Sequence, residues 1–154
     1  MKHWLMKSEP DEFSIDDLER RGVEPWSGVR NYQARNFMRD GMRDGDRVLF
    51  YHSSCAEPGV VGLARIRGAA YPDPTQFDPK SDYHDPASKP EEPRWLAIDV
   101  AFERKLARPV TLERIKAAAE RFEGLTLLAR GNRLSVFPVD PAHYKALVAM
   151  EKDR

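Results

Sequence analysis

The chain has 154 residues, of which 41% are hydrophobic, and its 25 basic and 25 acidic side chains cancel. This length suits one domain with a real core but hardly two, so we expect a single domain over residues 1–154. A neutral total also argues against tight, indiscriminate binding along a nucleic-acid backbone. No run approaches the roughly 18 apolar residues of a membrane span, the start lacks the apolar core of a secretory signal, and Cys55 is the only cysteine. We expect a cytoplasmic protein without membrane association, disulfide or thiolate metal cluster.

The first third of the chain is predicted to contain one strand and two helices. Residues His3 to Met6 have strand character and are followed by the turn Lys7–Pro10. Ser14 is a suitable N-cap for a helix running to about residue 21, and Asp17 stands at the capping-box position. Residues 31–38 predict a second short helix that ends near residue 41.

The middle third is predicted to contain two strands and a long loop. Residues 46–53 and 60–67 are β-branched and aromatic segments separated by a turn, typical of neighbouring strands in a barrel or curved sheet. Residues 71–93 contain six prolines among many Asp and Ser residues, which excludes regular elements of any length. Long loops in compact domains are often functional, so Tyr83 and His84 are candidates to close over a ligand. The alternative is an exposed connection without a role.

The last third returns to regular structure. Residues 95–104 have strand character, Thr111 can cap a helix running to about residue 122, and residues 133–137 form a late strand. Asp140 followed by proline is a clear start for a final helix through about residue 150. A few strands with peripheral helices indicate an α+β domain built around a small β-barrel.

One segment has the composition of a binding site. Trp26–Asn36 combines two aromatic rings, three amide side chains and two guanidinium groups in eleven residues, with no clean period of 3.6 or 2. An aromatic ring can stack on a nucleobase, amides offer both a donor and an acceptor, and arginine suits phosphate. The segment therefore predicts recognition of a nucleobase.

Four blocks of the sequence resemble the EVE domain family, in the same order and across essentially the whole chain. They are Trp4–Pro10, Trp26–Asn36, Gly45–Ser53 and Arg130–Val139. The resemblance implies a PUA-like β pseudobarrel with peripheral helices. It also implies a non-catalytic reader of a modified base in nucleic acid, with modified cytosine in DNA as the leading ligand and RNA as the alternative. It implies no catalytic residues. The dispersed histidines and the single cysteine give no sign of a metal, and we expect no other cofactor. A chain without a nuclease or helicase segment leaves open whether a separate effector protein acts as a partner on what is bound.

The base-binding hypothesis assigns roles to individual side chains. The candidates for the pocket are Trp26, Asn31, Ser8, Lys7, Glu9, Tyr32 and Tyr83. A flipped base is expected to stack on Trp26 while Asn31 and Ser8 read its edge; the alternative role of Trp26 is core packing. Lys7 and Glu9 form either an ion pair or direct polar contacts. Replacing Trp26 by alanine is expected to abolish selective binding and to leave the fold largely intact.

Arginines are the candidates for contacts with phosphate. They are Arg30, Arg35, Arg130 and Arg133. The alternative role for each arginine is to fix the pocket wall through an intramolecular salt bridge.

Two other classes of function remain as alternatives. The zinc deaminase signature and Gly-rich phosphate loops are absent from the sequence, which leaves a glycosylase-like enzyme with Glu9 or Asp46 as its acid. His52 is expected to be a structural rather than a catalytic residue. A protein-interaction module is the other alternative. A base reader needs a deep slot with Trp26 on its wall, whereas an interaction module needs a flat apolar patch.

Overall fold

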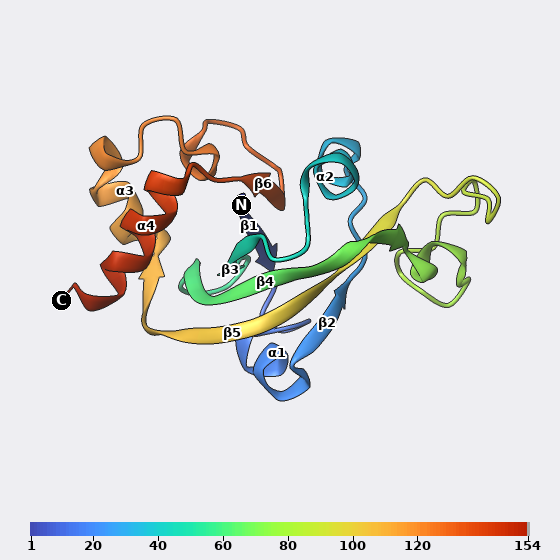
Figure 1. Ribbon diagram of the computed structural model, residues 1–154, viewed down its shortest axis with the longest axis horizontal. Helices are drawn as coiled ribbons and strands as arrows, with labels where there is room; N and C mark the ends of the chain where they lie inside the picture. Colours follow the sequence, from blue (N-terminus) through green and yellow to red (C-terminus); the bar gives the residue numbers. More distant parts are fainter. Residues whose placement is uncertain (154) are drawn as a thin grey trace.

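Among residues 1–153, which the computed structural model describes, six strands form one mixed sheet in the order β2-β5-β4-β3-β1-β6 (Figure 1). The strands are β1 His3–Ser8, β2 Val23–Trp26, β3 Arg47–His52, β4 Gly59–Pro72, β5 Leu96–Thr111 and β6 Val136–Pro138. The α-helices are α1 Ile15–Arg21, α2 Tyr32–Asn36, α3 Leu112–Ala117 and α4 Pro141–Ala149. Strands β1 and β3 pair in parallel, and all other neighbours pair antiparallel. The predicted α+β, PUA-like pseudobarrel class is confirmed.

The sheet buries both of its faces because apolar residues follow one another along its central strands. In β1, Trp4 and Met6 belong to one core cluster and Leu5 to the other, as the alternation of side chains along a strand requires. Helices α1 and α2 contribute to the first cluster, and α3 and α4 to the second. Figure 1 shows α3 and α4 gathered at one end of the molecule, away from α1 and α2. No helix within residues 1–153 is both long and apolar enough to span a bilayer.

Local signals for helix starts are confirmed. The Ser14 hydroxyl and the Asp17 carboxylate satisfy each other's backbone N–H groups in a complete capping box before α1. Thr111 caps α3 and Asp140 caps α4, with proline in the first turn of α4. The predicted helix from Thr111 to about residue 122 is too long, because α3 ends at Ala117 and only a single 3-10 turn follows.

The predicted strands are less accurate. The expected turn at Lys7 is wrong, because Lys7 and Ser8 continue the parallel pairing with β3. The predicted start of the last strand at residue 133 is also wrong, since β6 begins at Val136. Strand β2 was not predicted; it is short, contains Pro25 and lies at the sheet edge, where a missing N–H is tolerated.

The long loop between β4 and β5 is held together by two buried polar side chains. Gln76 donates to the carbonyl oxygens of Asp73 and Trp95 at 2.7 and 2.8 Å. Its own oxygen accepts from the Ser88 hydroxyl at 2.6 Å. The loop, which projects from the sheet in Figure 1, is therefore an ordered arm with many exposed side chains, and it gives Tyr83 a defined place.

Candidate functional site

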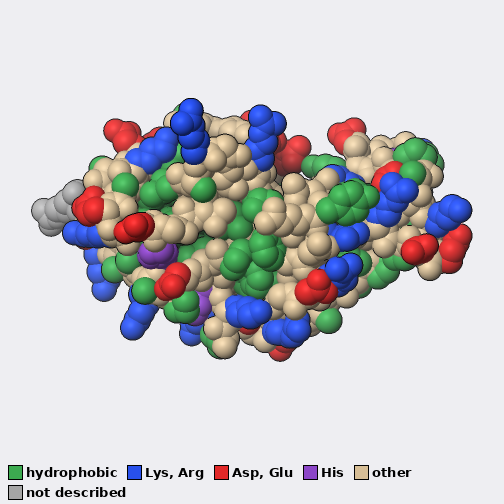
Figure 2. Space-filling view, turned by 90° about the horizontal axis from the view of Figure 1, so that it is seen from above, with side chains coloured by type: hydrophobic (Ala, Val, Ile, Leu, Met, Phe, Trp, Pro, Cys, Tyr) green, Lys and Arg blue, Asp and Glu red, His purple; other side chains and the backbone are tan. Residues whose placement is uncertain are grey.

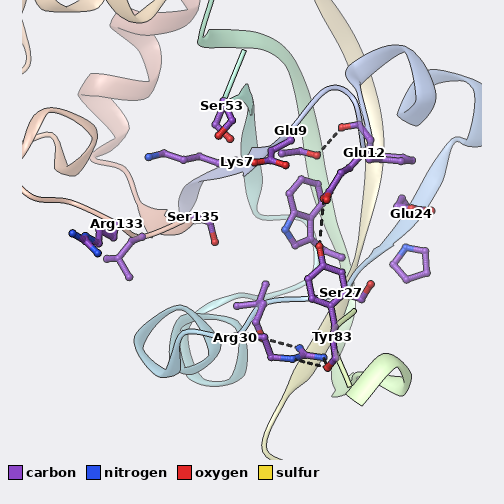
Figure 3. Close-up of a pocket in the computed structure, with 18 residues that line it drawn as sticks. Lys7, Glu9, Glu12, Glu24, Ser27, Arg30, Ser53, Tyr83, Arg133 and Ser135 are labelled. Atoms are coloured by element: carbon purple, nitrogen blue, oxygen red, sulfur yellow. Dashed lines mark hydrogen bonds between the residues drawn. The ribbon is translucent and has the colours of Figure 1, made fainter. Parts of the chain in front are cut away.

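A cleft of about 510 Å³ opens where the ends of β1, β2 and β3 meet (Figure 3). Its lining comes from six stretches of chain: residues 7–9, 12–13, 24–30, 53–54, 83 and 133–135. The volume lies within the range of about 300–1,000 Å³ that is usual for ligand sites. Of the residues predicted from the sequence, this cleft brings together Lys7, Ser8, Glu9, Trp26, Arg30, Tyr83 and Arg133.

Trp26 belongs to both the cleft and the core. The residue is 8% exposed and its ring meets Phe50 edge to face, with 5.5 Å between centroids and 84° between planes. Core packing, one of the two roles considered for Trp26, is therefore observed, and the residue also lines the cleft. Truncating a buried tryptophan to alanine costs about 3–5 kcal/mol, so we expect the Trp26→Ala change to destabilise the fold as well.

One side of the cleft is acidic. Glu9, Glu12 and Glu24 line it, and Glu12 accepts a hydrogen bond from the Tyr83 hydroxyl at 3.3 Å across the cleft. Burial raises the pKa of Glu24 above its usual range, although an ion pair with Arg21 at 2.9 Å acts in the opposite direction. The sequence contains no local motif for Glu12 and Glu24: Glu24 reaches the cleft through the pairing of β2 with β5, and Glu12 lies in the turn after β1, where its N–H donates to the carbonyl oxygen of Glu9.

Tyr83 and Arg30 fix the loop over the cleft. Arg30 donates two hydrogen bonds to the Tyr83 carbonyl oxygen, at 3.1 and 2.7 Å, and forms a 3.0 Å salt bridge with Asp73 (Figure 3). The ring of Tyr83 lies against Gly28, where a Cβ would approach it to 2.9 Å. Gly28 also has a φ of +81°, which favours glycine. Two roles were considered for Arg30, contact with phosphate and support of the pocket wall. The salt bridge and the hydrogen bonds agree with support of the pocket wall.

Lys7 and Ser8 occupy the floor of the cleft at the end of β1. The Lys7 ammonium lies 5.7 Å from the Tyr51 ring centroid, and burial lowers the pKa of Lys7. Within residues 1–153 it makes no salt bridge with Glu9. The Ser8 hydroxyl donates to the carbonyl oxygen of Phe13 at 2.6 Å, so it holds a turn and offers a ligand only acceptor capacity.

Four predicted site residues lie outside this lining, namely Asn31, Tyr32, Arg35 and Arg130. The Asn31 side chain caps α2 by accepting from the Ala34 N–H at 3.0 Å. Tyr32 is 51% exposed and stacks on Trp95, with 4.7 Å between centroids and 26° between planes. The Arg35 guanidinium lies 4.8 Å from the Tyr32 ring centroid. The helix cap and the stack hold the first three of these side chains away from the cleft.

A second hollow of about 340 Å³ adjoins the cleft. It is lined by Asn31, Gln33 and residues 129–134, and it shares Arg133 and Leu134 with the cleft. Arg130 and Arg133 are both exposed. The two predicted arginines thus meet at one place on the surface.

The residues considered for catalysis have structural partners. Asp46, the possible glycosylase acid, is 3% exposed and accepts from the Trp4 indole N–H at 3.0 Å and the Arg43 N–H at 2.9 Å. It lies outside the cleft lining. The His52 Nε2 atom accepts from the Ile15 N–H at 3.1 Å, and burial lowers the pKa of His52, which matches a neutral structural histidine. Within residues 1–153, no three His, Cys, Asp or Glu side chains group as metal ligands.

Fold and cleft together define a PUA-like α+β domain with a partly aromatic binding cleft. The EVE domain model matches residues 2–150, and the chain belongs to the EVE domain family. Thymocyte nuclear protein 1 of Mus musculus is 40% identical over 168 residues, covering 97% of this chain and 74% of the mouse protein.

Solved structures agree with this assignment. A protein from Pseudomonas syringae is 49% identical with a TM-score of 0.93, covering 97% of this chain and 99% of that one. Human THYN1, in a crystal structure with DNA containing 5-methylcytosine, is 38% identical with a TM-score of 0.95. That similarity covers 100% of this chain and 99% of the human chain.

Proposed function

We propose that this protein is a reader that binds DNA carrying a modified cytosine and takes the modified base into the Trp26 cleft. The observation that carries the proposal is the match over the whole chain to human THYN1 in complex with DNA containing 5-methylcytosine. The cleft of this chain supplies chemistry that suits such a ligand.

The cleft offers a flipped base an aromatic contact. Leaving the stack costs a base a few kcal/mol, and stacking on an aromatic ring recovers about 1–3 kcal/mol. Trp26 lines the cleft and is held by its contact with Phe50, so the ring is ordered before the base arrives. A fixed ring loses little conformational entropy on binding.

The acidic side of the cleft suits cytosine. A carboxylate accepts hydrogen bonds from the exocyclic amine of cytosine, whereas thymine presents a carbonyl oxygen at the same position. In our proposal Glu24, Glu12 or both accept from this amine, and the Lys7 ammonium donates to the base carbonyl. This assignment replaces Asn31 as the reader of the base edge, because Asn31 caps α2 outside the cleft.

Binding without catalysis is part of the proposal. Ser8 and His52 are a serine and a histidine that a nucleophilic mechanism would need as nucleophile and base, and both are engaged elsewhere: the Ser8 hydroxyl donates to the Phe13 carbonyl oxygen, and His52 Nε2 accepts from the Ile15 N–H. Incubation with an oligomer containing 5-methylcytosine, followed by mass spectrometry, is expected to return the oligomer intact. A released base would favour the glycosylase alternative, with Glu9 as the remaining acid.

The surface also favours a ligand that enters a cleft over a docked protein. Among residues 1–153, the exposed large hydrophobic residues are only Met1, Tyr32 and Tyr83. Figure 2 shows basic and acidic side chains interspersed on the face seen from above, rather than one field of a single sign. We further propose that the protein works inside the cell and leaves further action on the DNA to a separate effector protein.

A binding panel tests the proposed function. Short single- and double-stranded DNA and RNA oligomers would carry cytosine, 5-methylcytosine, 5-hydroxymethylcytosine or methylated adenine, at one moderate salt concentration. Selective binding of a modified-cytosine DNA is the expected result. Equal binding of all oligomers would overturn the reader assignment. Selective binding of a modified RNA would show that the polymer is RNA rather than DNA.

A further inference from the structure

The hollow beside the cleft has a different charge from the cleft itself. Among the described residues that line it, two are arginines, Arg130 and Arg133, and none is acidic. The cleft instead has three glutamates against Lys7, Arg30 and Arg133. An anion is therefore favoured in the hollow by charge alone.

Both arginines of the hollow are free to take a ligand. Within residues 1–153, neither guanidinium makes a hydrogen bond or a salt bridge to the protein. By contrast, Arg30 is tied to Asp73 and Arg104 makes a two-pronged contact with Glu151 at 2.9 and 2.7 Å. Arginine presents a planar fork of donors that matches phosphate oxygens.

The backbone of the same segment adds further donors. Within residues 1–153, the N–H groups of Arg130, Gly131 and Arg133 have no hydrogen-bond acceptor, although their neighbour Asn132 donates to Ala129. The Asn132 Nδ2 atom is buried and likewise lacks a partner there. Its orientation is fixed, because the other amide atom, Oδ1, accepts from the Leu134 N–H at 3.0 Å. The buried Asn132 Nδ2 donor is costly without an acceptor, and the exposed residues Arg130, Gly131 and Arg133 present their N–H groups where an anionic ligand can accept from them.

We propose that this hollow is a phosphate subsite that holds a DNA backbone phosphate next to the nucleotide in the Trp26 cleft. The identity of the polymer rests on the proposed function. The position of the phosphate follows from Arg133 and Leu134, because these two residues line both the cleft and the hollow and so place them side by side. A phosphate on this segment fixes the strand, while the cleft reads the base.

The salt dependence of binding tests the subsite. The variant Arg130→Gln/Arg133→Gln is compared with the wild type and with Arg67→Gln/Arg121→Gln, whose arginines are exposed and line neither hollow. Each lost phosphate contact reduces the slope of log K against log salt by about one. We expect a reduction of about one to two for the first variant and none for the control. Equal slopes for all three proteins would overturn the subsite.

A chemical change in the DNA identifies the phosphate. Phosphates flanking a single 5-methylcytosine are replaced one at a time by uncharged methylphosphonates. One replacement is expected to weaken binding by the wild type, with no further effect in the arginine variant. If each replacement weakens both proteins equally, the hollow does not hold that phosphate and the proposal is wrong.

The two proposals fail in different ways. The single variant Arg130→Gln is expected to keep the wild-type preference for modified over unmodified cytosine, because Arg130 lines only the hollow and the lining of the cleft is unchanged. A wild type without any such preference would contradict the reader function, while the salt slopes on unmodified DNA would still decide the phosphate subsite.

Discussion

The cleft and the hollow beside it differ in the charge of the side chains that line them. The cleft combines a nearly buried indole with three carboxylates, a half-buried lysine and a hydroxyl that is already engaged. Among the described residues, the hollow has arginines, amides and unpaired backbone N–H groups. In our proposal the first set discriminates between bases, and the second attracts any phosphate. On this proposal, a chain with zero net charge binds nucleic acid locally by separating selectivity from attraction.

The largest effect is expected from Trp26. Trp26→Ala should lower the free energy of unfolding by about 3–5 kcal/mol, because it empties part of the core beside Phe50. Selective binding should be lost, while the weaker, salt-dependent attraction remains. Denaturant unfolding and titration with paired modified and unmodified oligomers measure the two effects. Trp26→Phe separates them, since it retains an apolar ring; full selectivity in that folded variant would argue against an indole platform.

The next effect is expected from Glu24. Glu24→Gln should reduce the preference for cytosine over thymine in the cleft, since discrimination by a well-placed side chain is worth about 1–3 kcal/mol, or about 5- to 150-fold in affinity. Competition between matched oligomers measures this ratio. Glu19→Gln, an exposed change on α1 outside both hollows, is the control. The carboxylate has no such role if the ratio is the same in both variants, and Glu12→Gln then tests the second candidate.

Acid should weaken recognition in the cleft before it affects the hollow. Burial raises the folded-state pKa of Glu24, so its carboxylate takes up a proton at a higher pH than an ordinary glutamate does. A ligand that needs the ionised form therefore loses affinity as the pH falls through the raised pKa of Glu24, before an ordinary glutamate takes up its proton. The decline should be several-fold less in Glu24→Gln. Parallel profiles for the two proteins would show that another group titrates.

The smallest effect is expected from the bridge across the cleft. Tyr83→Phe removes a partly exposed hydrogen bond of 3.3 Å to Glu12, which contributes at most about 1 kcal/mol. Selectivity should persist and affinity should change by less than about fivefold, because the loop remains tied by Arg30. Stopped-flow association rates measure whether the bridge delays entry. A complete loss of binding would instead give the phenol a direct contact with the ligand.

The fold was more predictable from the sequence than the site. Ser14 with Asp17 and Asp140 with proline are complete local signals, and both start helices as expected. The edge strand β2 has no such signal, because its four residues gain strand geometry only by pairing with β5. Glu24 enters the cleft through that pairing, so its place depends on a contact distant in sequence.

Asn31 shows how one pattern can have two meanings. Its amide suits a nucleobase, but asparagine before a short helical segment is also a good N-cap, and the cap is what the structure contains. Arg30 is similar, since its guanidinium holds the loop that carries Tyr83. Residue type alone indicated a binding surface, and only the packing separated residues that line the cleft from those that support it.

The most direct test of this account is the ratio of dissociation constants for two duplexes that differ by a single 5-methyl group on cytosine. The ratio is measured at physiological salt for the wild type, Trp26→Phe and Arg130→Gln, whose arginine lines only the hollow. The account predicts tighter binding of the methylated duplex by the wild type, the same preference with weaker overall binding in the arginine variant, and a reduced preference in Trp26→Phe. Equal binding of the two duplexes by the wild type would contradict it.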